Sequence, residues 1–313
     1  NKGIIIENNP INSGTISIVF KGTYYNNPII VKLKRNNIED ILNKSISLMK
    51  AVSFILNNSY YRNLKLDLFL ETNMEYLFDQ INFKREISNI NLFYNNFKED
   101  ENIVIPYVYE NLSNNDVIVM EYLNGNIIHD LIKKEYNKNI LTYPNKFFIE
   151  SIMKYNVIHS DLHQGNILFM NNSDTIGIID FGLIKHTEKI EKKLLLLYLI
   201  GMHSPIEKFK NIILKSLVVK IDPNLNIHYD QNILHSSVEE FIRDRNKGCL
   251  QFIKIKDILE KYNLKIKPLF FKTIFHIAPF VDYVKYLTKL NKNSVSLEAL
   301  NKYKNNLIYS KLT

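Results

Sequence analysis

The chain has 313 residues, of which 46% are hydrophobic and 23% charged, so it can bury a substantial core and is not disordered as a whole. Its net charge of +8 comes from scattered rather than clustered lysines, which argues against nucleic-acid binding and leaves anionic nucleotides or peripheral contact with a membrane surface open. Cys249 is the only cysteine, which excludes an internal disulfide and indicates a reducing intracellular compartment, cytoplasmic or mitochondrial.

Apolar and β-branched residues predict three strands at the start of the chain, at Ile4–Glu7, Ser17–Tyr24 and Pro28–Lys34. Residues 8–17 are predicted to form a loop of small residues with a single glycine, Gly14. Such a loop can offer backbone N–H groups to phosphate oxygens, but an ordinary hairpin loop is the simpler explanation on this evidence alone. Lys32 lies between apolar neighbours in the third strand, and considered alone it is a solvent-facing strand lysine.

Helical spacing of apolar residues predicts the next elements, at Asn36–Asn57, Leu66–Phe78 and Phe83–Phe97. Glu86 lies beside the apolar stripe of the third of these helices, and by itself it is expected to be a solvated charge. Further strands are predicted at Ile103–Tyr109 and Asp116–Leu123. The break that follows them places a lobe boundary between a β-rich N-terminal lobe, residues 1–123, and a nearly all-helical C-terminal lobe, residues 124–313.

The second half of the chain is predicted to be mainly helical, with two short strands where the polar motifs lie. The expected strands are Asn166–Met170 and Thr175–Ile179. Its longest aliphatic run, Leu194–Met202, is too short to span a bilayer. The expected helices are Ile127–Tyr136, Asn145–Asn156, Ile190–Gly201, Ile206–Lys220, Val238–Lys247, Ile255–Tyr262, Pro268–Asn291 and Leu297–Leu307.

Three polar residues stand out between these apolar segments. Asn166 follows Asp161 by five residues, and Asp180 comes 14 residues later in Asp180-Phe181-Gly182. Phosphoryl transfer from a metal-bound nucleotide needs one carboxylate facing the acceptor, and an amide and a second carboxylate on the metal ions. With the strand residue Lys32 and the helix residue Glu86 ahead of them, these residues follow the order of a bilobal, α+β protein-kinase-like fold.

At the level of motifs the chain resembles the UbiB/ADCK family of atypical kinases. Residues 158–168 resemble the family's catalytic loop, which is close to H-x-D-x-H-P-G-N, and Asp180-Phe181-Gly182 completes that match. Phe83–Asn89 resembles the family's F-x-x-E-x-x-N helix motif, and Asn9–Val19 resembles its alanine-rich nucleotide loop. The resemblance covers about residues 4–290.

The resemblance implies an ATP- and magnesium-dependent phosphotransferase or ATPase, of a family that supports quinone and lipid metabolism. It makes Asp161 the catalytic aspartate, Lys32 and Glu86 an ion pair, and Asn166 and Asp180 the metal ligands. The residues that it places at the nucleotide are Gly14, Thr15, Ser17 and Lys32 at the phosphates, Met120, Glu121 and Leu123 at the adenine, and Val19 as a further cofactor-binding residue.

The chain departs from the family at several positions. Gln164 replaces the proline of the catalytic loop, and Gly14 and Thr15 interrupt the alanine-rich pattern. Lys32 and Glu86 are 54 residues apart, which fits an inserted helical segment. The family's N-terminal K-x-G-Q motif is not in the sequence, and a start at Asn1 rather than Met leaves an upstream segment open.

The acceptor is not named by the sequence. Ser160 stands where many protein kinases have an arginine, and no Ala-Pro-Glu follows Gly182, so a small molecule or lipid is favoured over a peptide. Two other functions stay open, a small-molecule kinase of the aminoglycoside or choline type and a nucleotide-binding pseudokinase scaffold. A transition-metal site at His159 and His163 is a further alternative, although the motif context favours packing and hydrogen bonding for His159.

Overall fold

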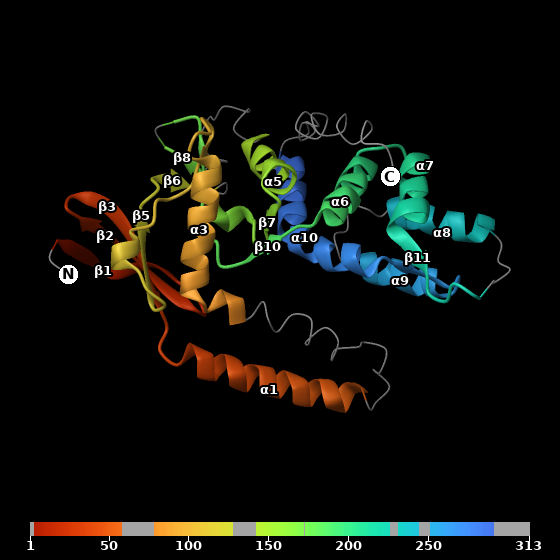
Figure 1. Ribbon diagram of the computed structural model, residues 1–313, viewed down its shortest axis with the longest axis horizontal. Helices are drawn as coiled ribbons and strands as arrows, with labels where there is room; N and C mark the ends of the chain where they lie inside the picture. The colour runs from red at the N-terminus through yellow and green to blue at the C-terminus, as the bar shows by residue number, and fades with distance from the viewer. Residues whose placement is uncertain are drawn as a thin grey trace. The chain divides into compact units, whose positions relative to one another are not determined.

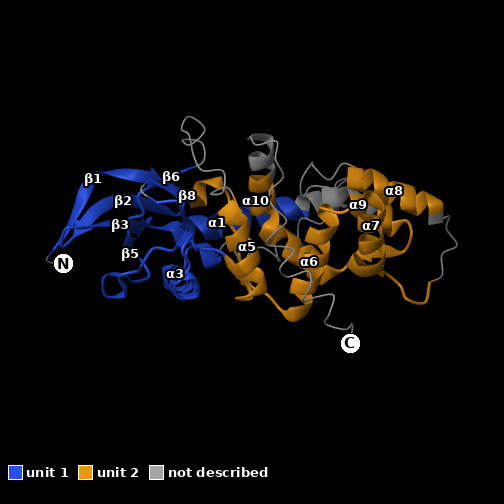
Figure 2. Cartoon of the chain, turned by 90° about the horizontal axis from the view of Figure 1, so that it is seen from above, with its two compact units in different colours: residues 1–132, 168–183 blue, residues 133–167, 184–313 orange. Residues whose placement is uncertain are grey.

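A computed structural model of the protein describes residues 3–57, 78–127, 142–171, 173–225, 231–243 and 251–290. The helices predicted at Leu66–Phe78, Ile127–Tyr136 and Leu297–Leu307, apart from Phe78 and Ile127, lie outside these residues, as does Cys249. Packing divides the chain into two compact units, coloured in Figure 2: unit 1 is residues 1–132 and 168–183, and unit 2 is residues 133–167 and 184–313. The lobe boundary after Leu123 stays a prediction.

Unit 1 is built on an antiparallel sheet with the strand order β1-β2-β3-β5. Ile29, Val31 and Val119 form the buried core of this sheet. The register places Val19 of β2 and Ile118 of β5 opposite Lys32 of β3. The strands are β1 (Ile4–Ser13), β2 (Ser17–Tyr24), β3 (Asn27–Lys34) and β5 (Val117–Glu121).

The first strand is longer than its apolar residues indicate. The sequence prediction ended it at Glu7 and assigned residues 8–17 to a loop, but β1 continues to Ser13, so that prediction is wrong for all but a short turn at Gly14. Register shifts at Pro10 and Asn12 keep the polar half of the strand paired with β2. An edge strand exposed on both faces needs no apolar alternation, and it tolerates proline and bulges.

Two helices of unit 1 have the bounds that periodicity predicts within two residues, α1 (Ile38–Asn57) and α3 (Phe83–Phe97). The Asn82 side chain caps α3 by accepting a hydrogen bond from the Arg85 N–H at 3.1 Å. This helix packs on β5, beside which it is drawn in Figure 1. Its buried face is Phe83, Glu86, Asn89, Ile90, Phe93 and Phe97.

A second, smaller sheet of unit 1 has the order β4-β9-β8-β6. Of the strand predicted at Ile103–Tyr109, only Ile103–Val104 is a strand in the structure. Pro106 has no backbone N–H to donate to a neighbouring strand, so the pairing does not continue through it. Val108 forms a single bridge to Met120. The segment that carries Asp180 leaves this sheet at the end of β9. The strands are β4 (Ile103–Val104), β6 (Gly125–Asn126), β8 (Ile167–Met170) and β9 (Ile176–Ile178).

Unit 2 is mainly helical. Two short strands of this unit, β7 (Val157–His159) and β10 (Ile184–His186), pair antiparallel with each other. Phe148 of α5 stacks on Phe280 of α10 at 4.1 Å between ring centroids. The helices are α5 (Tyr143–Met153), α6 (Lys189–Met202), α7 (Ile206–Ile212), α8 (Gln231–Arg243), α9 (Gln251–Glu260) and α10 (Pro268–Leu290).

The helix predicted over Ile206–Lys220 is wrong at its C-terminal end. After α7 the backbone widens into a π-helical turn at Ile213–Leu217 and then becomes β11 (Val218–Lys220), which pairs with β12 (Leu264–Ile266). Val218 and Val219 are β-branched and favour the extended form once a partner strand is present.

Within the described parts of the chain, no helix combines the length and apolar character needed to cross a bilayer.

Candidate functional site

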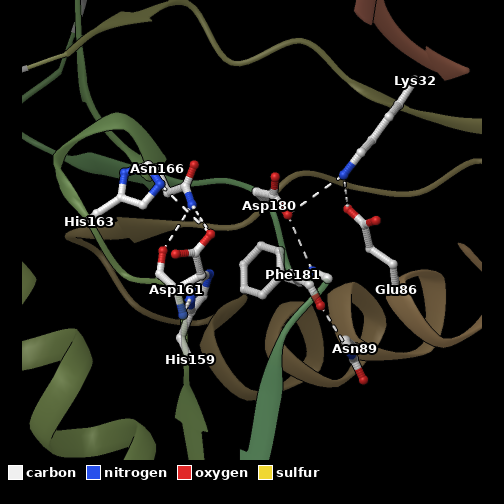
Figure 3. Close-up of polar contacts among 10 residues, drawn as sticks. Lys32, Glu86, Asn89, His159, Asp161, His163, Asn166, Asp180 and Phe181 are labelled. Carbon is white, nitrogen blue, oxygen red and sulfur yellow. Dashed lines mark hydrogen bonds and ion pairs between the residues drawn. The ribbon is translucent and has the colours of Figure 1, made fainter. Parts of the chain in front are cut away.

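The charged cluster of unit 1 centres on Lys32, whose side chain leaves β3 and is only 10% exposed (Figure 3). Its Nζ donates to Oε1 of Glu86 on α3 at 2.6 Å and lies 3.6 Å from Oδ1 of Asp180, which follows β9. Neither residue looks special on its own, because a lone strand lysine or helix glutamate is usually solvated. The structure places both in the interior, and it thereby confirms the predicted ion pair.

Burial and charge act in opposite directions on this pair. Desolvation by itself would lower the pKa of Lys32, but the negative charges of Glu86 and Asp180 outweigh it and raise that pKa above its ordinary value. For the Glu86 carboxyl, burial acts to raise the pKa and the Lys32 ammonium counteracts it. The lysine therefore carries its positive charge at neutral pH, in a position where it can attract an anion.

The Asp180-Phe181-Gly182 segment is held against α3 by polar and aromatic contacts. Asn89 donates from Nδ2 to the Phe181 carbonyl oxygen at 2.8 Å, and the Phe181 ring lies 4.9 Å from that of Phe93. Asp180 has a φ of 61°, in the left-handed region, and its Oδ1 accepts a hydrogen bond from the Gly182 N–H at 3.3 Å. A non-glycine residue keeps this strained conformation only where its surroundings fix it, as the contacts of Phe181 do here.

The turn between β1 and β2 is closed by the chain itself. The Gly14 N–H donates to the Ser17 carbonyl oxygen at 3.0 Å, and Arg35 donates from Nε to the Gly14 carbonyl oxygen at 2.8 Å. A Cβ at Gly14 would lie 3.7 Å from its nearest neighbour, so the backbone leaves space for alanine there. Sequence reasoning missed Arg35, which also donates to the Ser13 hydroxyl at 2.7 Å. Thr15 lies within this turn.

The residues predicted at the adenine lie on β5 and just after it. Met120 and Leu123 are buried, and Met120 pairs with Ile30 of β3. The Glu121 N–H donates to the Tyr107 carbonyl oxygen at 2.8 Å, and the Leu123 carbonyl oxygen accepts from the Gly125 N–H at 3.1 Å. Their contact with adenine stays a prediction.

In unit 2, the loop after β7 is organised around the backbone of Asp161 (Figure 3). The Asp161 N–H donates to His159 Nδ1 at 3.3 Å, and the Asp161 carbonyl oxygen accepts from Asn166 Nδ2 at 2.9 Å. The His163 ring caps the following turn, because its Nδ1 accepts from the Gly165 N–H at 3.0 Å. The Asp161 carboxylate is 39% exposed, and its Oδ2 lies 3.7 Å from His163 Nε2 and 3.5 Å from Asn166 Nδ2.

Each unit carries one side chain with oxygen donors of the kind that a hard cation prefers. In unit 2, Asn166 is buried and uses Nδ2 to hold the loop, so Oδ1 is its side-chain atom that could ligate a cation. In unit 1, Asp180 has carboxylate oxygens with the side chain 45% exposed. Oxygen ligands of this kind suit magnesium. Among the described residues, no three His, Cys, Asp or Glu side chains gather as a transition-metal site would require.

Comparisons with known proteins identify relatives in one family. The ABC1 atypical kinase-like domain model matches residues 5–208. The chain is 28% identical over 200 residues to the chloroplastic "ACTIVITY OF BC1 COMPLEX KINASE 1" of Arabidopsis thaliana, covering 59% of this chain and 29% of that protein. It is 26% identical over 198 residues to the "Probable protein kinase UbiB" of Shewanella denitrificans, covering 59% of this chain and 36% of that protein.

These figures mean that the chain spans about a third of the length of these curated relatives. Among solved structures, the chain resembles that of Rv3197 with erythromycin from Mycobacterium tuberculosis, with a TM-score of 0.55 and 15% identity. That likeness covers 91% of this chain and 76% of the other. Together with the family match it confirms the predicted α+β, protein-kinase-like fold.

A test of the ion pair uses Glu86→Leu, Lys32→Met and the double variant that combines these two changes. Each single change leaves a buried charged group of unit 1 without its nearest partner, so we expect it to lower the free energy of unfolding by about 2–4 kcal/mol. The double variant replaces both charges with apolar groups, and it should be more stable than the sum of the two losses predicts. Urea unfolding measures all three.

Lys84→Met is the matched control for these variants. Lys84 lies two residues before Glu86 on α3 and is exposed. Surface substitutions of this kind change stability by about 0.5 kcal/mol or less, so the control should be nearly neutral. Additive losses in the double variant would contradict a coupled, buried pair.

Proposed function

Because the chain belongs to the ABC1 atypical kinase-like family, the UbiB/ADCK family of its motifs, we propose that it binds ATP with magnesium and transfers or hydrolyses the terminal phosphoryl group. The observation that carries this proposal is the buried Lys32–Glu86 pair with Asp180 beside it. A lysine fixed by a helix glutamate is the group that protein kinases use to hold nucleotide phosphates. A pair with a purely structural role has no need for a third charge such as Asp180.

The proposed roles follow from the surroundings of each residue. Lys32 attracts the phosphates, and Asn166 and Asp180 offer oxygen ligands to magnesium, which bound there would offset phosphate charge. Asp161 accepts or orients the proton of the attacking hydroxyl or water. Gly14, Thr15 and Ser17 are assigned to the phosphates, and Val19 of β2 is assigned to the bound nucleotide. Met120, Glu121 and Leu123 are assigned to the adenine.

For the acceptor, we favour a small molecule or lipid over a peptide. Ser160 occupies the position at which many protein kinases carry an arginine for a phosphorylated activation loop, and its hydroxyl instead lies 2.9 Å from His276 Nδ1. The link to quinone or lipid metabolism implied by the family belongs to the same proposal. A pseudokinase scaffold that binds nucleotide without turnover is the alternative, which the experiments below separate.

The first experiment concerns the metal. ATP should raise the melting temperature of the protein by several degrees when magnesium is present, because a ligand that binds only the folded state stabilises it by mass action. The rise should disappear when EDTA removes the metal. Asp180→Asn should weaken it, since that variant loses a charged ligand. An equal rise with and without magnesium would show that Asn166 and Asp180 are not metal ligands.

The second experiment separates binding from turnover. Asp161→Asn keeps the shape of the side chain and removes its charge, so ATP affinity should stay the same or rise slightly. ATP turnover, measured as phosphate release, should fall by about 100-fold or more, the usual scale for a positioned base. Asp180→Asn is the matched comparison, because there ATP affinity itself should fall. Undiminished turnover in Asp161→Asn would refute phosphotransfer through this residue and favour the scaffold.

A further inference from the structure

A buried polar contact in unit 2 joins two segments that are far apart in sequence. His276 Nδ1 on α10 lies 2.9 Å from the hydroxyl of Ser160, 116 residues earlier. Ser160 immediately precedes Asp161, and both partners are less than a tenth exposed. The family model matches residues 5–208, so α10 lies outside it. The contact is therefore supplied by a part of the chain that the family motifs do not describe.

Helix α10 is itself anchored one turn before His276. The Thr273 hydroxyl donates to Oε1 of Glu191 at 2.8 Å, and Lys185 Nζ lies 2.9 Å from the same oxygen. Glu191 is 2% exposed, and its other oxygen accepts from the Glu188 N–H at 2.8 Å, which caps α6. A buried carboxylate needs such a set of donors. The bonds tie α10 to α6 and to β10.

Strand β10 links this anchored helix to the loop that carries Asp161. Lys185 of β10 pairs with Ile158 of β7, and β7 leads directly into Ser160. The polar network therefore runs from the strand before Asp161, through β10 and α6, to α10 and back to Ser160. Phe148 and Phe280 stack on the α5 side of α10 and hold the helix in place.

The imidazole of His276 is uncharged at neutral pH. Burial lowers its pKa to about 4, the positive charge of Lys185 acts in the same direction, and Glu191 opposes them. A neutral ring can share one hydrogen bond with the Ser160 hydroxyl in either direction. It therefore holds the loop without bringing a positive charge next to the Asp161 carboxylate.

We propose that His276 is a positioning residue for Asp161: by holding the Ser160 hydroxyl, it fixes the loop backbone from which the catalytic carboxylate is presented. This inference rests on the proposed phosphotransfer or hydrolysis. The N–H and carbonyl oxygen of Asp161 are held by His159 and Asn166, and the Ser160 contact restrains the same loop from α10. In many protein kinases the residue before the catalytic aspartate is an arginine that pairs with a phosphorylated activation loop. Here that position is Ser160, which meets an uncharged histidine on a packed helix instead.

The test measures steady-state ATP hydrolysis, as phosphate release, for the full chain and its variants. His276→Leu fills much of the volume of the ring and removes the hydrogen bond, and it should lower kcat by about 10-fold, because small displacements of a catalytic group cost one to two orders of magnitude. KM for ATP should change less than about twofold, since the contact lies on the Asp161 loop. His276→Asn places a polar atom near the former Nδ1 and should restore most of kcat.

Two further variants make the result specific. Lys272→Ala changes an exposed residue of α10 four positions before His276 and should leave kcat unchanged. Ser160→Ala should lower kcat to the same degree as His276→Leu, and the double variant should be no slower than either, because both remove one hydrogen bond. A structural role alone would not produce this non-additivity in kcat at constant KM.

The outcomes separate the two proposals. Absence of turnover in the wild-type protein overturns the proposed function and this inference with it. Turnover in the wild type with unchanged kcat in a folded His276→Leu, or additive losses in the double variant, overturns the inference alone. If His276→Leu does not fold, as circular dichroism would show, Ser160→Ala and His276→Asn decide in its place: a kcat loss in the first with near-wild-type kcat in the second supports the inference, and any other pattern overturns it.

Discussion

Burial of the Lys32 ammonium is the constraint on which the arrangement of unit 1 depends. A positive charge in the middle of a sheet is tolerated only if a carboxylate reaches it, and Glu86 does so at 2.6 Å. Helix α3 must therefore present Glu86 to the sheet, on the same face as its phenylalanines. The Asn82 cap fixes where α3 begins, and the aromatic stripe fixes which face of the helix is buried. Both place Glu86 on the face that the ion pair with Lys32 requires.

The same helix also organises the segment after β9. Asn89 lies three residues beyond Glu86 and bonds the carbonyl oxygen of Phe181, whose ring packs near Phe93. One face of α3 therefore sets both the partner of Lys32 and the strained backbone at Asp180. This explains why the motif F-x-x-E-x-x-N spaces its polar residues by three: a helical turn brings both to the same side.

The loop of unit 2 that carries Asp161 is held through its backbone and through Ser160. The contacts are the ring of His159, the amide of Asn166 and the hydroxyl of Ser160 against neutral His276. The carboxylate itself has Oδ2 3.7 Å from His163 Nε2 and 3.5 Å from Asn166 Nδ2. The charged part of the network, Lys185 with Glu191, stabilises the helices behind the loop. The Asp161 carboxylate stays partly exposed at the end of this loop, as its proposed role of proton acceptor requires.

The sequence by itself determined features that depend on neighbouring residues: the bounds of β2 and α3, the spacing of Asp161, Asn166 and Asp180, and through them the family. Periodicity and motif spacing are properties of residues close together in the sequence, so they can be recognised without knowing which segments pack together in the fold. Only the tertiary structure decided that Glu86 is buried rather than solvated, that polar residues extend β1 to Ser13, that Val218–Lys220 is a strand, and that His276 meets Ser160. Each of these depends on the pairing or desolvation energy of groups brought together by folding, up to 116 residues apart, and no local pattern encodes that energy.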